Sequence, residues 1–106
     1  DKQNNVITYK DIHFRSEVEF SKYSLESANV DMLFRQFEDV KTQCIQALED
    51  RLAFVGYDFC ISASHIFNLL DARGAISVAR RQEYILQIRE LSKACASCYV
   101  QNLELK

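Results

Sequence analysis

Apolar side chains recur every three or four positions along most of this chain, as they do in amphipathic helices. The first such segment spans about residues 29–51, and polar side chains occupy the positions between the apolar ones. Its stripe consists of Val30, Leu33, Phe34, Phe37, Val40, Cys44, Leu48 and Leu52. Ser27 or Asn29 can cap the start of this helix. A stripe of this length needs a packing partner along the whole helix.

Two further helices are expected after the first. The second spans about residues 57–73, after a break at 50–56, and the third spans about 78–101. The buried face of the second is expected to contain Tyr57, Cys60, Ile61, Ser64, Phe67 and Leu70. The stripe of the third contains Ile85, Ile88, Leu91, Cys95 and Tyr99, with Tyr84 and Cys98 at its flank. Three amphipathic helices with short connections predict an all-α fold, an antiparallel three-helix bundle.

The N-terminal residues do not settle into one period. Val6 and Ile7 are β-prone, whereas Phe14, Val18 and Phe20 fit neither a helical nor a strand pattern consistently. We therefore interpret residues 1–23 as an N-terminal arm, extended or partly helical, and residues 24–106 as a helical bundle domain. Because the chain begins with Asp and not Met, we expect it to be a piece of a longer protein, with the arm leading from a missing catalytic domain.

The connection between the second and third helices holds polar residues with structural uses. Arg73 places a cation in the last helical turn, and Gly74 stands where a left-handed residue commonly ends a helix. Ser77 is expected to cap the next helix. Asn68 and Asp71 lie on one side of the second helix, and we expect them to tie its end to the turn by hydrogen bonds. Arg73 is expected to pair with Asp71 or with a neighbouring helix.

No constellation of residues predicts catalysis. His65 and Asp71 share one side of a helix, but no nucleophile at matched spacing and no phosphate-binding glycine loop accompany them. Three arginines of the third helix leave two interpretations open. Arg80, Arg81 and Arg89 either lie on a solvated face or contact RNA or another subunit.

The composition supports a helical, soluble chain. Its 106 residues include no proline and two glycines, and the formal net charge is −2. Residues 1–72 hold seven basic and twelve acidic side chains, whereas residues 73–93 hold five basic and two acidic ones. This positive stretch is far weaker than that of a dedicated nucleic-acid binder. No apolar run is expected to reach the length of a membrane span, so no membrane contact is expected.

The four cysteines raise the question of a metal site. Cys95 and Cys98 have the C-x-x-C spacing of zinc ligands, but a structural zinc site needs four ligands that converge. This pair falls within one predicted helix, and Cys44 and Cys60 fall in two others. We therefore expect no metal site, and buried, reduced thiols that suit the cytosol.

One string is specific enough to suggest a family. Residues 67–78 read F-N-L-L-D-A-R-G-A-I-S-V, and an Arg and Tyr84-Ile85 follow. Together with T-Y-K-D at residues 8–11 and E-V-E-F-S-K-Y at 17–23, this string resembles the C-terminal helical region of the alpha subunit of bacterial glycyl-tRNA synthetase, the two-subunit type. The resemblance extends from about residue 8 to residue 99.

The chain also departs from the pattern of that family. Lys10 stands where the family has a glycine, and Phe14 and Phe20 stand where it has polar residues. Arg80 replaces the Glu of a capping box, which puts positive charge near the positive end of the third helix. Contacts that the polar side chains make in the family therefore cannot be carried over to this chain.

The resemblance implies part of a glycine–tRNA ligase, a class II aminoacyl-tRNA synthetase that uses ATP and Mg²⁺ to activate glycine and attach it to tRNA(Gly). It also implies a beta subunit, an alpha dimer within an alpha2-beta2 tetramer, and a cytoplasmic location. The motifs that bind ATP and glycine in that family lie in an N-terminal catalytic domain, and nothing in this chain matches them. We therefore expect a piece with no catalytic residues and no bound cofactor, which supports the catalytic domain and contacts the beta subunit or tRNA. The alternative is a freestanding helical protein-interaction module, and class II motifs upstream in the gene would exclude it.

Overall fold

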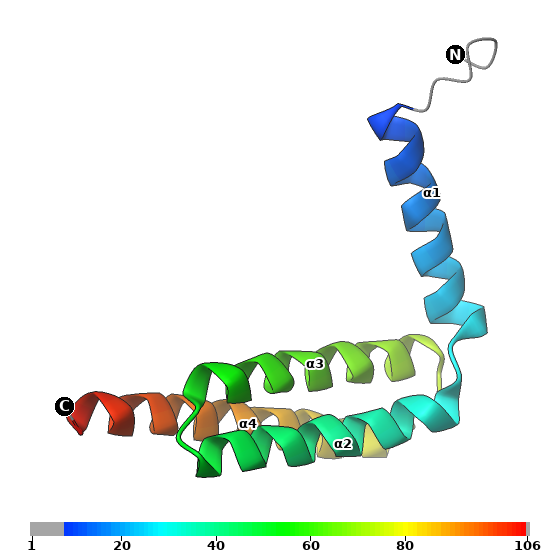
Figure 1. The fold of residues 1–106 in the computed structure, drawn as a ribbon. Helices are drawn as coiled ribbons and strands as arrows, with labels where there is room; N and C mark the ends of the chain where they lie inside the picture. Colours follow the sequence, from blue (N-terminus) through cyan, green and yellow to red (C-terminus); the bar gives the residue numbers. More distant parts are fainter. Residues whose placement is uncertain (1–7, 106) are drawn as a thin grey trace.

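The computed structural model describes residues 8–105, and its regular elements are all helices (Figure 1). In chain order they are helix α1 (Tyr9–Lys22), a π-helical turn η1 (Tyr23–Ser27), and helices α2 (Val30–Glu49), α3 (Ala53–Ala72) and α4 (Val78–Glu104). No strand occurs within residues 8–105. The prediction of an all-α fold is confirmed.

Helix α1 forms most of the expected N-terminal arm and extends away from the other three helices (Figure 1). Thr8 and Asp11 form a capping box: the Thr8 hydroxyl accepts from the Asp11 N–H at 3.1 Å, and the Asp11 carboxylate accepts from the Thr8 N–H at 3.4 Å. This cap explains why the segment after Thr8 is helical and not extended. Val6 and Ile7 lie outside the described residues. No residue of α1 is buried.

Helix α2 begins where the sequence indicated and ends two residues early. Asn29 is its N-cap, and the Asn29 side-chain oxygen accepts from the Met32 N–H at 3.0 Å. Leu33, Phe37 and Cys44 of the predicted stripe are buried. Leu52 is exposed, because α2 has already ended at Glu49 and Leu52 is the residue before α3.

Helix α3 starts at Ala53, four residues before the predicted start, so the expected bounds of 57–73 were wrong at this end. The reversal occupies only residues 50–52, because Arg51 adopts a left-handed conformation with φ 61°. Gly56 does not break the helix. It lies inside α3, where a Cβ would come within 2.6 Å of Leu48 Cδ2, so the glycine allows α2 and α3 to approach closely.

The buried face of α3 also differs from the prediction. It contains Ala53, Gly56, Cys60, Ala63, Phe67 and Leu70. Tyr57 and Ile61 are exposed, and Ser64 is half-buried. A hydrophobic pattern favours the larger side chains, whereas the buried face includes small residues that contact both neighbours: Gly56 lies against Leu48 of α2, and the Cys60 thiol donates to the Ile88 carbonyl of α4 at 3.9 Å. The buried residues nevertheless step by three and four, as a helix packed on one side requires.

Helix α3 also corrects the expectation that no segment reaches the length of a membrane span. By length and composition alone, Ala53–Ala72 is long and apolar enough to cross a membrane. In the structure this helix packs against both α2 and α4. Of its most apolar 18-residue window, 33% is buried in this packing.

Helix α4 extends to Glu104, three residues beyond the predicted end. Tyr84 and Cys98 were expected at the flank of its stripe, but both are buried, whereas Tyr99 is exposed. The Tyr84 ring lies at the centre of an aromatic cluster. Its centroid is 4.8 Å from that of Phe37 in an edge-on contact and 6.0 Å from that of Phe67. The core thus lies where α2, α3 and α4 meet, and Phe37, Leu70 and Cys44 are its largest fully buried side chains.

Candidate functional site

The turn between α3 and α4 closes with the complete set of hydrogen bonds of a Schellman motif. The Ala75 N–H donates to the Leu70 carbonyl at 3.0 Å, and the Gly74 N–H donates to the Asp71 carbonyl at 3.0 Å. Gly74 has φ 67°, the left-handed conformation that this motif needs at the first residue after the cap. Ile76 is buried against the core directly afterwards. The chain reversal is therefore fixed by local chemistry.

Ser77 begins helix α4 as its N-cap. The Ser77 hydroxyl accepts from the Arg80 N–H at 3.2 Å, and the Ser77 carbonyl accepts from the Arg81 N–H at 2.9 Å. Arg80 stands three residues after the cap, where a capping box would have Glu or Gln. The Ser77 cap therefore lacks the second hydrogen bond of a capping box, in which the cap N–H donates to a Glu or Gln side chain.

The side chain of Arg80 is 57% exposed, and its guanidinium lies over two aromatic rings. Its guanidinium carbon lies 5.9 Å from the ring centroid of Phe34 and 5.5 Å from that of Tyr84. The Arg80 Nη2 atom also donates to the Tyr84 hydroxyl at 3.4 Å, and the Arg80 Nε atom lies 3.8 Å from the carboxylate of Glu83. Cation–π contact with two rings offsets the unfavourable position near the start of a helix.

Arg81 connects the two helices that the turn joins. Its Nη2 and Nε atoms donate to the Asp71 carboxylate oxygen Oδ1 at 2.8 and 3.2 Å. We expected Asp71 to form hydrogen bonds within the local turn. Its carboxylate instead accepts from Arg81, which lies ten residues later, on the following helix. Two of the three arginines considered for RNA or subunit contact, Arg80 and Arg81, thus already have partners within the chain.

Arg73 joins a different pair of segments. Its guanidinium donates through Nη1 to the backbone carbonyl of Ala28, between η1 and α2. Of the two partners expected for Arg73, Asp71 was wrong, and the contact with a neighbouring segment is present. Ala28 itself is buried. This hydrogen bond therefore fixes the connection between η1 and α2 to the end of α3.

The remaining candidate residues lie apart from this cluster. Asn68 and Arg89 are exposed, on α3 and α4, and neither side chain makes a hydrogen bond to another described residue. His65 is also exposed, and the carboxylate of Asp71 is taken up by Arg81. The arrangement thus does not bring His65 and Asp71 together as a proton-transfer pair.

Sequence reasoning missed the residues that complete the cluster. Phe34 comes from α2, and its contact with Arg80 joins positions 46 residues apart, which no local pattern indicates. The Ala28 contact uses a backbone carbonyl, which carries no signal in the sequence. The contact of Arg80 with Tyr84 could have been found, because the two residues are four apart on one helix.

The four cysteines are buried free thiols. The Cys44 and Cys95 sulfurs lie 4.0 Å apart, between α2 and α4. Burial, with a smaller effect of the nearby Cys95, raises the pKa of Cys44 to about 12, and burial also raises the pKa of Cys60 and of Cys95. Within the described part of the chain, no group of three His, Cys, Asp or Glu side chains could hold a metal ion. At neutral pH these three thiols are protonated and therefore poor nucleophiles.

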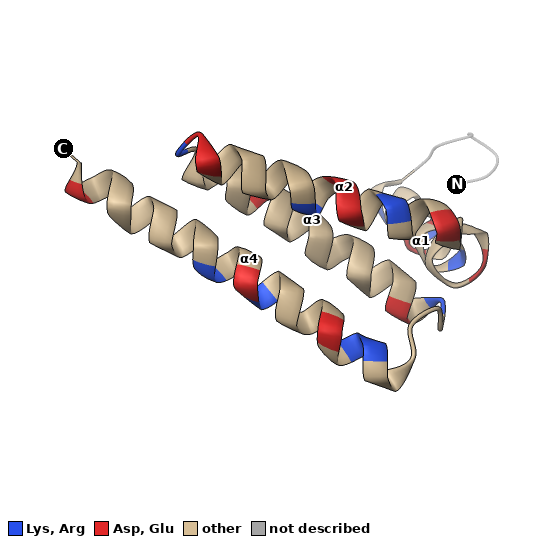
Figure 2. Ribbon diagram, turned by 90° about the horizontal axis from the view of Figure 1, so that it is seen from below, with Lys and Arg blue, Asp and Glu red and all other residues tan. Residues whose placement is uncertain are grey.

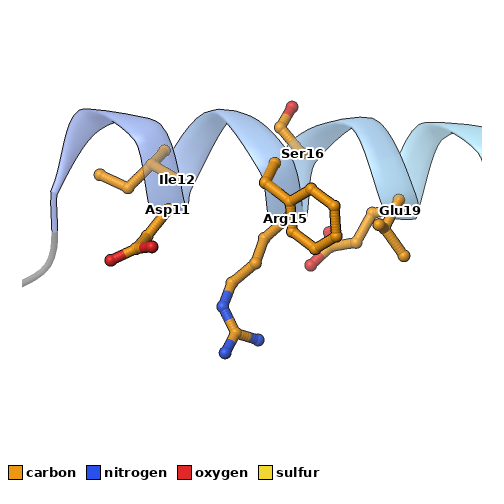
Figure 3. A pocket seen from close by; sticks show the side chains of 7 residues that line it. Asp11, Ile12, Arg15, Ser16 and Glu19 are labelled. Atoms are coloured by element: carbon orange, nitrogen blue, oxygen red, sulfur yellow. The ribbon is translucent and has the colours of Figure 1, made fainter. Parts of the chain in front are cut away.

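Helix α1 carries apolar side chains that are exposed. One hollow there is lined by Asp11, Ile12, Phe14, Arg15, Ser16, Val18 and Glu19, all from this single helix (Figure 3). A hollow with walls from one helix is an open surface and cannot enclose a substrate. It does show that the apolar side chains of the arm have no cover among the described residues.

The comparison with protein families identifies the chain. Residues 2–104 match the family described as "Glycyl-tRNA synthetase alpha subunit". The match covers nearly the whole chain, so this protein belongs to the glycyl-tRNA synthetase alpha subunit family. The resemblance drawn from residues 67–78 is confirmed. The family is a ligase family, and membership implies tRNA and subunit partners in general terms.

The Asp71–Arg81 pair leads to a prediction about stability. Asp71→Ala is expected to lower the free energy of unfolding by about 1 kcal/mol, because the loss of the charge-assisted hydrogen bonds is softened by solvent. The two side chains are 34% and 41% exposed, which limits the loss. Asp71→Asn should recover part of the loss, because its amide oxygen still accepts. Urea unfolding followed by circular dichroism measures both.

Asp58→Ala is the matched control, since Asp58 is an exposed carboxylate on the same helix. The free energy of unfolding of this variant should stay within about 0.5 kcal/mol of that of the wild type. If both Asp71 variants unfold like the wild type but weaken assembly or tRNA charging, Asp71 serves binding and the structural role is wrong.

Proposed function

We propose that this chain is the C-terminal helical domain of a glycyl-tRNA synthetase alpha subunit and that α2, α3 and α4 form an antiparallel three-helix bundle within it. The observation that carries the proposal is the family match over residues 2–104, on a chain whose described part is entirely helical. The short reversals at residues 50–52 and 73–77 support the antiparallel arrangement.

The proposed division places the arm at residues 1–23 and the bundle at 24–106. Helix α1 has no buried residue, and Phe14 and Phe20 on it are exposed. An isolated helix of this length is marginal in water, so these side chains need a cover. We propose that the catalytic domain, which precedes the arm in the full subunit, supplies it.

In this proposal the bundle does no chemistry itself. The full enzyme is a class II synthetase that binds ATP and Mg²⁺, activates glycine and transfers it to tRNA(Gly). The bundle supports the catalytic domain and contacts the beta subunit or tRNA, within a cytoplasmic alpha2-beta2 assembly. The contacts of Arg80 and Arg81 with other residues of the chain favour a structural role for the α3–α4 turn. Of the three arginines, Arg89 is the one with an exposed side chain and no described partner.

Glycine-dependent ATP–pyrophosphate exchange tests the proposal. The 106-residue chain alone is expected to show no exchange, because it contains no residues that resemble the ATP-binding motifs of the family. A full alpha subunit that ends in this chain should show exchange and should charge tRNA(Gly) when the beta subunit is added. Removal of residues 24–106 from that subunit should reduce charging. Exchange by the 106-residue chain, or unchanged charging after the deletion, would contradict the proposal.

A further inference from the structure

Two of the four buried thiols meet between different helices. The Cys44 sulfur of α2 and the Cys95 sulfur of α4 lie 4.0 Å apart, within reach of a weak hydrogen bond from one thiol to the other. The two residues are 51 positions apart in the sequence, so only the folded chain brings them together. If one of the two sulfurs is oxidised, the other is therefore already in contact with it.

The two thiols differ in their access to solvent. Cys44 is fully buried, whereas Cys95 lines a hollow of about 280 Å³ between α3 and α4, together with Phe54, Tyr57 and Tyr99. The Phe54 and Tyr99 rings are in edge-on contact, with centroids 5.6 Å apart. A hollow of this size admits a small molecule, although Cys95 itself is only 4% exposed. A small oxidant therefore reaches Cys95 before it reaches Cys44.

The parts of the helices that hold these thiols carry no charged side chains. Residues 42–48, 59–70 and 94–103 include no Lys, Arg, Asp or Glu, and the second half of α4 is accordingly tan in Figure 2 until its last turn. Lys93 is the basic residue closest in sequence to Cys95, and it is exposed, about 200° around the helix from Cys95. Burial raises the pKa of both Cys44 and Cys95. Both thiols are therefore protonated in the resting protein, and the pair reacts slowly with oxidants.

We propose that Cys44 and Cys95 are a redox-sensitive pair, which a hydroperoxide converts into a disulfide that joins α2 to α4. The Cys95 sulfur attacks one oxygen of the hydroperoxide; an S–O bond forms, the O–O bond breaks, and an alcohol or water leaves with the thiol proton. The Cys44 sulfur then attacks the sulfenic sulfur of Cys95; the S–S bond forms, and the hydroxyl leaves as water with the Cys44 proton. The two thiols together lose two electrons, and the hydroperoxide gains them. The inference does not depend on the proposed function, because it uses only the positions of the thiols and the hollow.

The disulfide closes a loop that contains all of α3. The chain between residues 44 and 95 also includes the reversals on both sides of that helix. A cross-link across so long a loop restricts the unfolded chain and thereby stabilises the folded one. The oxidised chain is therefore expected to unfold at a higher urea concentration than the reduced chain, and dithiothreitol should reverse the shift.

Peptide mapping tests the pairing in the unaltered chain. The purified chain is treated with hydrogen peroxide, its free thiols are blocked with N-ethylmaleimide in denaturant, and trypsin is added without reductant. Trypsin cuts after Lys and Arg, which places Cys44 in residues 42–51, Cys60 in residues 52–73, and Cys95 with Cys98 in residues 94–106. Mass spectrometry should show residues 42–51 linked to residues 94–106. The number of free thiols should fall from four to two.

Two cysteines of α4 provide matched variants. Cys95 and Cys98 are both buried and lie about one turn apart, but the Cys95 sulfur is the one that contacts Cys44. Cys98→Ala should leave the rate of cross-linking within about twofold, whereas Cys95→Ala should lower it at least about tenfold. Circular dichroism should show the same helix content for both variants, so that unfolding is excluded as the cause.

Three results would overturn the inference. In the first, no link between residues 42–51 and 94–106 forms within a single chain, whether the cysteines stay reduced or become sulfinic acids. In the second, the two alanine variants form the link at equal rates. In the third, the oxidised chain unfolds at the same urea concentration as the reduced chain or at a lower one. The exchange and charging assays of the proposed function do not depend on these results, so the two proposals fail separately.

Discussion

Phe37→Ala is expected to lower the free energy of unfolding by about 3–5 kcal/mol, the largest loss we expect from one substitution. Phe37 is fully buried, and its ring meets the Tyr84 ring edge-on at 4.8 Å. Truncation leaves a cavity where α2, α3 and α4 meet and removes the Phe37 ring from the aromatic cluster around Tyr84. Urea unfolding followed by circular dichroism measures the loss.

Phe14→Ala is the control for this variant, because it removes the same group from an exposed position on α1. It should change the free energy of unfolding by less than about 0.5 kcal/mol. Equal losses for the two variants would show that α1 packs on the other helices in solution, contrary to the arrangement in Figure 1.

Gly56→Asn is expected to cost about 2–3 kcal/mol, through overpacking and burial of a polar group. A Cβ at residue 56 would lie 2.6 Å from Leu48 Cδ2 and 3.0 Å from Leu48 Cγ. To make room, the Leu48 side chain must move, whereas the nearest backbone atom of α2, the Cys44 carbonyl oxygen, would lie at an ordinary contact distance of 3.6 Å. The same unfolding measurement applies.

The other glycine of the chain gives the contrast. Gly74 has φ 67°, but nothing lies within 4 Å of a Cβ there. Asn tolerates the left-handed conformation better than other side chains, so Gly74→Asn should cost less than about 1 kcal/mol. If Gly74→Asn costs as much as Gly56→Asn, the close approach of α2 and α3 is not the reason for the glycine at residue 56.

Features that depend on neighbouring residues were predictable from the sequence. Ser77 caps α4, Asn29 caps α2 as one of the two candidates, Ser27 and Asn29, and Gly74 ends α3 in the left-handed conformation. Each of these residues acts on backbone groups within a few residues. The all-α fold followed for the same reason, since helical periodicity is a local property. The string at residues 67–78 indicated the family, which the match over residues 2–104 then showed.

Features that depend on packing were not predictable. Gly56 was interpreted as part of a break, although it lies within α3 against Leu48. A glycine that ends a helix and one that admits a neighbouring helix look alike in a single sequence. Tyr57 was expected on the buried face of the second helix, whereas Ala53 and Ala63 occupy the buried positions. The partner helix decides which side of an apolar segment is covered.

At the candidate site, too, local features were predictable and contacts between helices were not. The sequence indicated that Asp71, Arg73 and Arg81 lie near one turn, but not which groups they bind. The partner of Arg81 lies ten residues away, and that of Arg73 lies 45 residues away. Specific pairing of long side chains depends on how three helices are placed, and only the folded chain supplies that information.

The bond from Arg73 to the Ala28 carbonyl fixes the segment from which η1 and α1 extend to the end of α3. Helix α1 has 14 residues and is therefore about 21 Å long. A tilt of about 10° at the pivot would move its far end by about 4 Å, at 1.5 Å of helix per residue. The far end of α1 is therefore the part of the described chain whose position depends most on the angle at which α1 leaves the segment around Ala28.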